Sequence, residues 1–341
     1  MTGFDPNAAA QPGSGVFGLP DDERSAGVIL LQVPFDATTS YRRGAADGPA
    51  AIVEASRQVD LFDRELGRPY EAGIFACEPD PRIGEWNARA RALADPILAA
   101  GGAGDDAALL GALAEVNALS ERLDALVEEE VEGWLSRGKL VGVVGGDHAT
   151  PLGAIAAHAR RHPGLGVLHV DAHADLRDAY EGFTRSHASI MFNVLARCPD
   201  VARIVQVGVR DFGEGELEVQ RRAGDRVRCF FDADLARAKL EGASWASLTA
   251  PIVAALPGQV YVSFDIDGLD PSLCPSTGTP VPGGLSFHEA CYLLSAVARS
   301  GRRIVGFDLN EVAPGEGEWD ANVGARLLYK MIGCALLSRG A

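Results

Sequence analysis

The chain has 341 residues, of which 47% are apolar and 23% are charged, and its formal net charge is −16. This is the composition of a folded globular protein that can bury a large core. The negative charge argues against nucleic-acid binding, which needs a basic surface. A negative charge also attracts cationic substrates, although solubility is the commoner reason for it.

Targeting features are absent from the sequence. No apolar run is long enough to span a bilayer, and no basic region followed by an apolar stretch marks a secretory signal. The six cysteines include no CxxC pair, which argues against a zinc ribbon or a thioredoxin motif. We therefore expect a cytoplasmic protein with reduced thiols and no membrane partner.

The N-terminal third has a mixed pattern. Residues 1–26 are rich in Gly, Pro, Ala and Asp, which predicts a flexible or surface-draped arm before one catalytic domain over 27–341. Val28–Val33 is predicted as a buried strand, followed by a long loop over 34–49 and a helix over 50–63. Residues 77–111 are irregular in pattern, with GGAGDD (101–106) as a clear break.

The rest of the chain alternates between helices and strands. Apolar residues recur at helical spacing over 116–134, the run of glutamates there is a solvated face, and Gly138 ends the helix. Strands are then expected at 140–144, 166–170, 204–209, 227–231, 260–265 and 304–309, with helices at 151–161, 187–197, 215–223, 245–255, 287–299 and 320–338. This alternation predicts a single-domain, three-layer α/β/α fold with a parallel sheet.

Four of the predicted strands run directly into acids or histidines. The segments are VGVVGGDH, GVLHVDAHAD, VYVSFDID and RIVGFDLNE. In a parallel α/β sheet, ligands bind outside the carboxyl ends of the strands. The four segments therefore predict one site that is built from distant parts of the chain.

The residue types at these strand ends are those of a metal site. In an extended DAHAD segment, Asp171, His173 and Asp175 would point the same way, and so would Asp265 and Asp267 in DID. With His148, the set has four carboxylates and two imidazoles. Four crowded carboxylates repel one another, and two divalent cations would balance them. Oxygen-rich ligation with two imidazoles suits Mn²⁺ better than Zn²⁺, and two such ions can activate a shared water.

Each motif also has a simpler interpretation. A DxHxD segment alone is often a surface loop or an ordinary ion network, and GGDH alone is weaker still. Three such motifs at three strand ends of one predicted sheet are hard to produce by chance.

Several longer segments resemble the ureohydrolase family, which includes the arginases and agmatinases. They are SYRRGAADGPAAI (40–52), GGDHATP (145–151), DAHADLR (171–177), SFDIDGLDPSLCPSTGTPVPGGLS (263–286) and DLNEVAP (308–314). The resemblance covers about residues 28–338. It implies a three-layer α/β fold, a dimanganese centre, hydrolysis of a guanidinium group to urea and an amine, and a homotrimer or homohexamer.

The resemblance assigns six side chains to two metal ions, for which Ni²⁺ or Co²⁺ are alternatives to Mn²⁺. Two of the carboxylates, Asp171 and Asp265, match bridging ligands. The first ion is matched by His148, Asp171, Asp175 and Asp265. The second ion is matched by Asp171, His173, Asp265 and Asp267.

Two further residues match catalytic positions. Glu311 matches the carboxylate that pairs with the substrate guanidinium, and a carboxylate can indeed accept two parallel N–H bonds from that group. The alternative for Glu311 is a surface ion pair. His187, in TRSHASIMFN, resembles a histidine that relays protons to the leaving amine, although its context is HA and not the usual HG. The alternative for His187 is a structural bond at a helix start.

The remaining polar residues of these motifs receive simpler interpretations. Asp147 is predicted to orient the ligands beside it. The other histidines have no matching context, and structural or surface roles are expected for His158, His162, His169 and His288.

The substrate tail is the least determined feature. Arg177, Asp178 and Glu181 stand where contacts to the tail are expected, GGDHA replaces the usual GGDHS, and the Asn-bearing stretch of arginases is missing. Acids at the mouth favour a cationic amine, whereas Arg177 favours a carboxylate.

The sequence thus predicts a cytosolic manganese amidinohydrolase that converts agmatine to urea and putrescine in polyamine biosynthesis. The alternatives within the class are arginine, guanidinobutyrate, aminopropylagmatine and guanidine. Outside it stand a one-zinc deacetylase of related fold and a non-catalytic relative.

Overall fold

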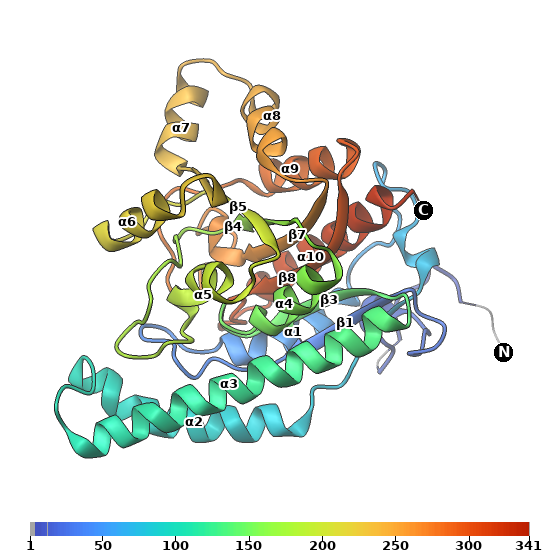
Figure 1. The fold of residues 1–341 in the computed structure, drawn as a ribbon. Helices are drawn as coiled ribbons and strands as arrows, with labels where there is room; N and C mark the ends of the chain where they lie inside the picture. The colour runs from blue at the N-terminus through green and yellow to red at the C-terminus, as the bar shows by residue number, and fades with distance from the viewer. Residues whose placement is uncertain (1–3, 12, 341) are drawn as a thin grey trace.

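The computed structural model describes residues 4–11 and 13–340. Its centre is one eight-stranded sheet in the order β2-β1-β3-β8-β7-β4-β5-β6, in which every pairing is parallel (Figure 1). The strands are β1 (Val28–Val33), β2 (Ile74–Ala76), β3 (Leu140–Gly145), β4 (Leu165–Val170), β5 (Val201–Val207), β6 (Val227–Phe230), β7 (Gln259–Asp265) and β8 (Arg303–Asn310).

Helices cover both faces of this sheet. Alternate side chains of β1 enter different cores, Val28 and Leu30 on one face and Ile29 and Leu31 on the other. One face packs against α1 (Gly48–Ser56), α7 (Asp232–Leu240), α8 (Trp245–Ala255), α9 (Phe287–Arg299) and α10 (Trp319–Ser338). The other packs against α2 (Pro81–Ala100), α3 (Ala107–Ser136), α4 (Leu152–Arg161) and α5 (Ile190–Arg197), with α6 (Glu214–Ala223) at its edge. The predicted three-layer α/β/α fold is confirmed.

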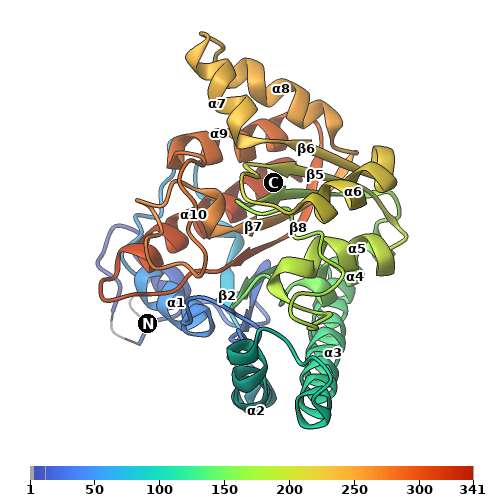
Figure 2. The ribbon, with the colours of Figure 1, turned by 90° about the vertical axis from the view of Figure 1, so that its left-hand side faces the viewer.

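The segment from 77 to 111 differs from its prediction. It is not irregular throughout, because α2 is a regular 20-residue helix that begins at an Asp80 cap and ends at Gly101 in the left-handed region. The helix buries small side chains such as Ala90 and Ala94, which gave little apolar signal. The GGAGDD segment does break the chain between α2 and α3. Figures 1 and 2 show these two helices as a long hairpin that projects beyond the sheet.

Three other elements also differ from the prediction. The short strand β2 and the helix α7 were not predicted, and α1 ends at Ser56, seven residues before the predicted end at 63.

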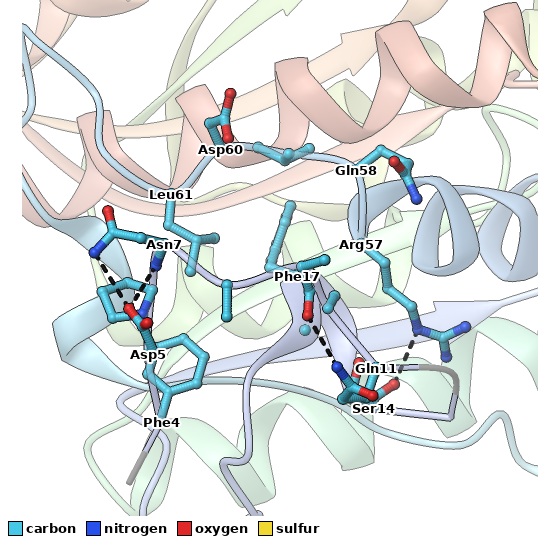
Figure 3. A pocket seen from close by; sticks show the side chains of 16 residues that line it. Phe4, Asp5, Asn7, Gln11, Ser14, Phe17, Arg57, Gln58, Asp60 and Leu61 are labelled. Carbon is cyan, nitrogen blue, oxygen red and sulfur yellow. Dashed lines mark hydrogen bonds between the residues drawn. The ribbon is translucent and has the colours of Figure 1, made fainter.

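The N-terminal segment packs onto the domain over its described residues. Val16, Phe17 and Leu19 are buried. The Phe17 amide donates to Ser56 Oγ at 2.7 Å, and the Phe17 ring lies 4.9 Å from the ring of Tyr329. A hollow of about 580 Å³ lies between this segment and residues 57–61 (Figure 3).

Within residues 4–11 and 13–340, the structure contains no helix with the length and apolar character needed to cross a bilayer.

Candidate metal centre

The four strands that carry the motifs are neighbours in the middle of the sheet. Their order is β3-β8-β7-β4, so their carboxyl ends meet at one edge (Figures 1 and 2). Gly145 ends β3 just before His148, Val170 ends β4 just before Asp171, and β7 ends at Asp265. The topology therefore brings together residues that lie more than a hundred positions apart.

His148 lies among three carboxylates. Its Nδ1 atom is 2.9 Å from Asp171 Oδ2, 3.3 Å from Asp265 Oδ2 and 3.5 Å from Asp175 Oδ2. All four residues are buried. These atoms are close enough together for one small ion to bind among them in place of their direct contacts.

His173 forms a second group beside the first. Its Nδ1 atom is 3.3 Å from Asp171 Oδ1 and 3.1 Å from Asp267 Oδ2. Asp171 therefore presents one oxygen to each group, as a carboxylate between two ions would.

The local backbone explains how the acids converge. DAHAD lies just beyond β4 and bends at Ala172, and DID enters a 3-10 helix over Ile266–Gly268, so the expected extended alternation is not found. Asp171 Oδ1 accepts from the His173 amide at 2.6 Å, and Asp265 Oδ1 accepts from the Asp267 amide at 2.8 Å. Each Asp thus closes a turn on the residue two positions later, a conformation that aspartate favours.

Two site residues have strained backbones. Asp175 has φ of 53° and Glu311 has φ of 62°, a region that non-glycine residues seldom adopt. Such strain is kept only where the surrounding structure fixes it, and it concentrates at functional sites.

The electrostatics of the cluster favour cations. Burial, followed by the charge of neighbouring aspartates, raises the pKa values of Asp175 and Asp265 well above their usual range. A divalent cation would reverse this effect, because it stabilises the ionised carboxylates. The donor set of carboxylate oxygens and imidazole nitrogens fits divalent ions such as Mn²⁺.

A fully buried polar row lies beneath the cluster of histidines and aspartates. Gln206, His169, Ser263 and Asp308 lie side by side on β5, β4, β7 and β8 and are all 0% exposed. Ser263 Oγ lies 2.9 Å from His148 Nε2 and donates to Asp308 Oδ1 at 3.0 Å. This row gives His148 a fixed ring orientation.

His169 contacts the ligand group directly. Gln206 Nε2 donates to His169 Nδ1 at 3.0 Å, which leaves the proton of the neutral ring on Nε2, 2.9 Å from Asp171 Oδ2. Sequence reasoning grouped His169 with the structural or surface histidines. The signal that could have found it is a histidine within an otherwise apolar strand, two residues before the first aspartate.

Glu311 lies beside His148 on the other side. Its Oε1 atom accepts from the His148 amide at 3.0 Å, and its own amide donates to Gly146 O at 2.7 Å. Burial and the nearby charges of Asp265 and Asp147 raise its pKa well above the usual range. A cationic group placed here would stabilise the ionised carboxylate.

A pocket of about 160 Å³ opens next to the cluster and contains His187. The Nδ1 atom of His187 is buried and has no hydrogen-bond partner within residues 4–11 and 13–340, although the ring itself is partly exposed to the pocket. Burial lowers the pKa of His187 to about 4, so its imidazole is neutral at pH 7. The lining residues are Ser40, His173, Asp175, Arg177, Tyr180, His187, Ala188, Asp211, Phe212, Glu216 and Thr279.

Of the three residues predicted to contact the substrate tail, Arg177, Asp178 and Glu181, only Arg177 lines this pocket. Arg177 lines the pocket, where it stacks on the Tyr180 ring and lies 3.5 Å from Glu216 Oε2. Asp178 instead lines a neighbouring hollow of about 620 Å³. Glu181 is not among the residues that line the pocket.

Two other acids line the pocket in their place. Asp211 and Glu216 follow β5, in the segment GVRDFGEGE, which no motif identified. The signal in the sequence was weak, since it was only another strand end followed by acids.

Asp147 lies one layer behind the ligands. Its carboxylate accepts from the Ala149 amide at 3.1 Å and from Thr38 Oγ1 at 3.5 Å. It therefore holds the turn that carries His148 against the loop after β1.

Comparisons with known proteins agree with this architecture. The family model described as "Arginase family" matches residues 26–334. The N(1)-aminopropylagmatine ureohydrolase of Thermus thermophilus is 36% identical over 328 residues, which is 95% of this chain and 96% of that protein. The agmatinase of Bacillus anthracis is 30% identical over 293 residues, covering 84% and 83% of the two chains.

Solved structures share the fold. The agmatine ureohydrolase of Thermoplasma volcanium superposes with a TM-score of 0.71 at 23% identity, covering 94% of this chain and 93% of that one. The proclavaminate amidino hydrolase of Streptomyces clavuligerus gives 0.73 at 23% identity, with 97% and 99% covered. The family match extends over nearly the whole sequence, and the chain belongs to the arginase family.

Proposed function

We propose that this chain is a dinuclear, manganese-dependent amidinohydrolase that cleaves an aminoalkyl guanidine to urea and an amine. The observation that carries the proposal is the buried cluster in which Asp171 presents one oxygen to each of two ligand groups. We propose two substrates, agmatine and its N1-aminopropyl derivative. Putrescine would be the product from agmatine. The setting would be polyamine synthesis in the cytoplasm.

The six residues assigned by resemblance are the proposed metal ligands. His148 and Asp175 would hold one ion and His173 and Asp267 the other, with Asp171 and Asp265 shared between them. Two bound cations would lower the pKa of a shared water and so supply the nucleophile. The buried row beneath would hold the ligands in place during the reaction.

Glu311 is the proposed guanidinium partner. Its carboxylate is buried and lies beside the cluster, and its Oε1 atom accepts from the His148 amide. Among the described residues no hydrogen bond engages its Oε2 atom. A planar guanidinium can donate two parallel N–H bonds to a carboxylate. Such a pair would orient the guanidinium carbon toward the ligand groups.

His187 is the proposed proton carrier for the leaving amine. Its ring is neutral and lies in the wall of the pocket, where an amine leaving from the cluster would pass. Its Nδ1 atom has no hydrogen-bond partner in the part of the chain that the structure describes. A neutral imidazole can accept a proton at one nitrogen and release one at the other.

The charges of the pocket support a cationic tail. The guanidinium of Arg177 already faces Glu216, so it is less available to a substrate carboxylate. Asp211 is exposed at the pocket and forms no ion pair within the described residues. An ammonium group would be attracted by this carboxylate. The name of the Thermus relative adds support for the longer substrate.

Urea release from a panel of guanidino compounds tests the proposal. With Mn²⁺ supplied, agmatine and N1-aminopropylagmatine should show higher kcat/KM than arginine, guanidinobutyrate or guanidine.

Asp211→Asn tests the proposed tail contact. This variant should reduce the ratio of kcat/KM for amine-bearing substrates to kcat/KM for carboxylate-bearing substrates. Elemental analysis should give two ions per active chain. A preference for a carboxylate-bearing substrate would contradict the proposed tail, and a single bound ion would contradict the dinuclear centre.

We also infer a homotrimer or homohexamer from membership of the family. Sedimentation velocity at several concentrations should give one of these species. A stable monomer that retains full activity would contradict this inference.

A further inference from the structure

One wall of the pocket is a closed loop between β4 and α5. The Arg177 amide donates to Ala188 O at 3.1 Å and closes residues 177–188 on themselves. Two side chains of this loop, Tyr180 and His187, line the pocket, with their rings 6.0 Å apart in an edge-on arrangement. The shape of the pocket therefore depends on where this loop is held.

The tip of the loop is a tight turn that faces α3. Tyr180 and Phe183 exchange backbone hydrogen bonds of 3.1 and 2.9 Å. The two residues between them, Glu181 and Gly182, have φ of 52° and 90°, and type I′ turns require positive φ at both positions. Phe183 is fully buried in the same core as the inner face of α3.

Asn117 of α3 binds the backbone of this tip. Its Oδ1 atom accepts from the Thr184 amide at 3.0 Å and from Thr184 Oγ1 at 3.2 Å, and its Nδ2 atom donates to Gly182 O at 3.3 Å. The loop and α3 also lie in close contact, because a Cβ added to Gly182 would be 2.6 Å from Leu113 Cδ2. Asparagine is a weak helix former, so its place within α3 is explained by these bonds.

Two turns further along the same face, α3 forms a buried ion pair with the loop. Arg185 Nε lies 2.5 Å from Asp124 Oδ2, and the two side chains are 6% and 13% exposed. Arg185 Nη2 also lies 3.1 Å from Glu121 Oε1. Arg185 stands two residues before His187, so this ion pair holds the loop close to the imidazole that lines the pocket.

We propose that α3 is a positioning element for the substrate pocket, acting through Asn117 and the Asp124–Arg185 pair on loop 177–188. These α3 residues lie at i and i+7 and share one helix face. They bind the loop, while Tyr180 and His187 of the same loop form the pocket wall. The inference rests on the proposed function in so far as this pocket is the substrate site.

The decisive variant is Asn117→Ala, with Asn117→Asp as the conservative variant that keeps the bonds to Thr184. We expect Asn117→Ala to lower kcat/KM by about tenfold to a hundredfold, since small misplacements of pocket groups have effects of this order. Amide hydrogen exchange should speed up over residues 180–186. Asn117→Asp keeps the acceptor for Thr184 but loses the donor to Gly182 O, so it should recover part of both properties. Bound metal should stay unchanged in each variant.

Glu115→Gln is the matched control. It lies on the same helix and removes the ion pair with Arg89 of α2 at 2.8 Å, without touching the loop. If Asn117→Ala changes exchange and kinetics no more than Glu115→Gln does, the positioning role is wrong. Loss of bound metal in Asn117→Ala would also overturn it, because the effect would then arise at the cluster.

Asp124→Asn gives an independent test of the ion pair. Removing one partner of a buried pair can prevent folding, in which case the Asn117 variants decide the question. If the folded Asp124→Asn protein keeps wild-type kinetics and exchange, the pair has no positioning role. Should the wild-type chain release no urea from any guanidino compound, the proposed function fails, whereas hydrogen exchange still tests whether α3 holds the loop.

Discussion

Glu311 combines three properties that are costly unless they serve a purpose: burial, positive φ and a raised pKa. Glu311→Gln keeps the shape and the bond from the His148 amide but removes the charge. A charge-assisted hydrogen bond contributes about 1.5–3 kcal/mol. We therefore expect kcat/KM to fall at least about tenfold with both metals retained, measured by urea release and elemental analysis. Unchanged kinetics would exclude Glu311 as the guanidinium partner.

Gln206 supports the cluster in two ways, because its Nε2 atom donates to His169 Nδ1 at 3.0 Å and to Ala174 O of the DAHAD segment at 2.7 Å. Gln206→Met keeps the length of the side chain but removes the donor that fixes the ring of His169. Changes of this kind behind a metal ligand typically cost about 10–100-fold in metal affinity. Titration calorimetry with Mn²⁺ on the metal-depleted protein measures this effect. Gln259→Met, at the first residue of β7 and away from the cluster, is the control. Equal affinities in the two variants would contradict the supporting role of Gln206.

At this scale the sequence predicted the residues that carry motifs and missed those that do not. The six proposed ligands, Glu311 and His187 all lie at the cluster or the pocket, because the strand order brings the motif-bearing strands together. Asp211 and Glu216 enter the pocket from a strand with no motif. Their contribution depends on how the segment after β5 bends, which periodicity does not encode.

At the scale of elements, the N-terminal segment contributes to the core. Phe17 is 2% exposed and packs on Tyr329. Phe17→Ala should lower the free energy of unfolding by about 3–5 kcal/mol, the usual cost of removing a buried phenyl ring. Denaturant unfolding measures the change. Phe4→Ala, in the same segment but 43% exposed, should be nearly neutral. Equal effects of the two variants would contradict a structural role for this segment.

The elements that sequence predicted correctly are those with strong periodicity. Strand β3 is a continuous apolar run, and α3 carries a clear apolar stripe. In contrast, α2 buries only two large apolar side chains, Ile83 and Ile97, with an asparagine and two alanines between them, so its apolar face was weak in the sequence. The bends at DAHAD and DID depend on hydrogen bonds that aspartate oxygens accept from nearby amides, and this local bonding competes with the extended form. A pattern of alternating acids cannot distinguish the two.

At the scale of the whole molecule, the polar layers of the sheet are arranged by depth. The ligand groups lie at its carboxyl edge, and the row of Ser263 and Asp308 lies one layer below. His158 of α4 lies deeper still, with its ring 5.0 Å from the ring of Tyr261. It fits because residue 306 is glycine: a Cβ there would lie 2.2 Å from His158 Nε2.

His158 couples folding to pH. Burial lowers its pKa to about 4 from its ordinary value of 6.5, and the hydrogen bond between its Nδ1 atom and Ala154 O at 2.8 Å does not offset that effect. Between these two values the unfolded chain binds a proton that the folded chain does not. The free energy of unfolding therefore falls as pH falls from about 6.5 to about 4, by roughly 3 kcal/mol for this residue.

His158→Gln removes that titration. Denaturant unfolding between pH 7 and pH 4 should show a smaller loss of stability on acidification in this variant than in the wild type. The quantity to compare is the difference between the free energies of unfolding at pH 7 and at pH 4, because the substitution also changes packing at every pH. His288→Gln, on the exposed side of α9, controls for the loss of an imidazole. If the wild type and His158→Gln lose equal stability over this range, the buried neutral ring is not the source of the acid sensitivity.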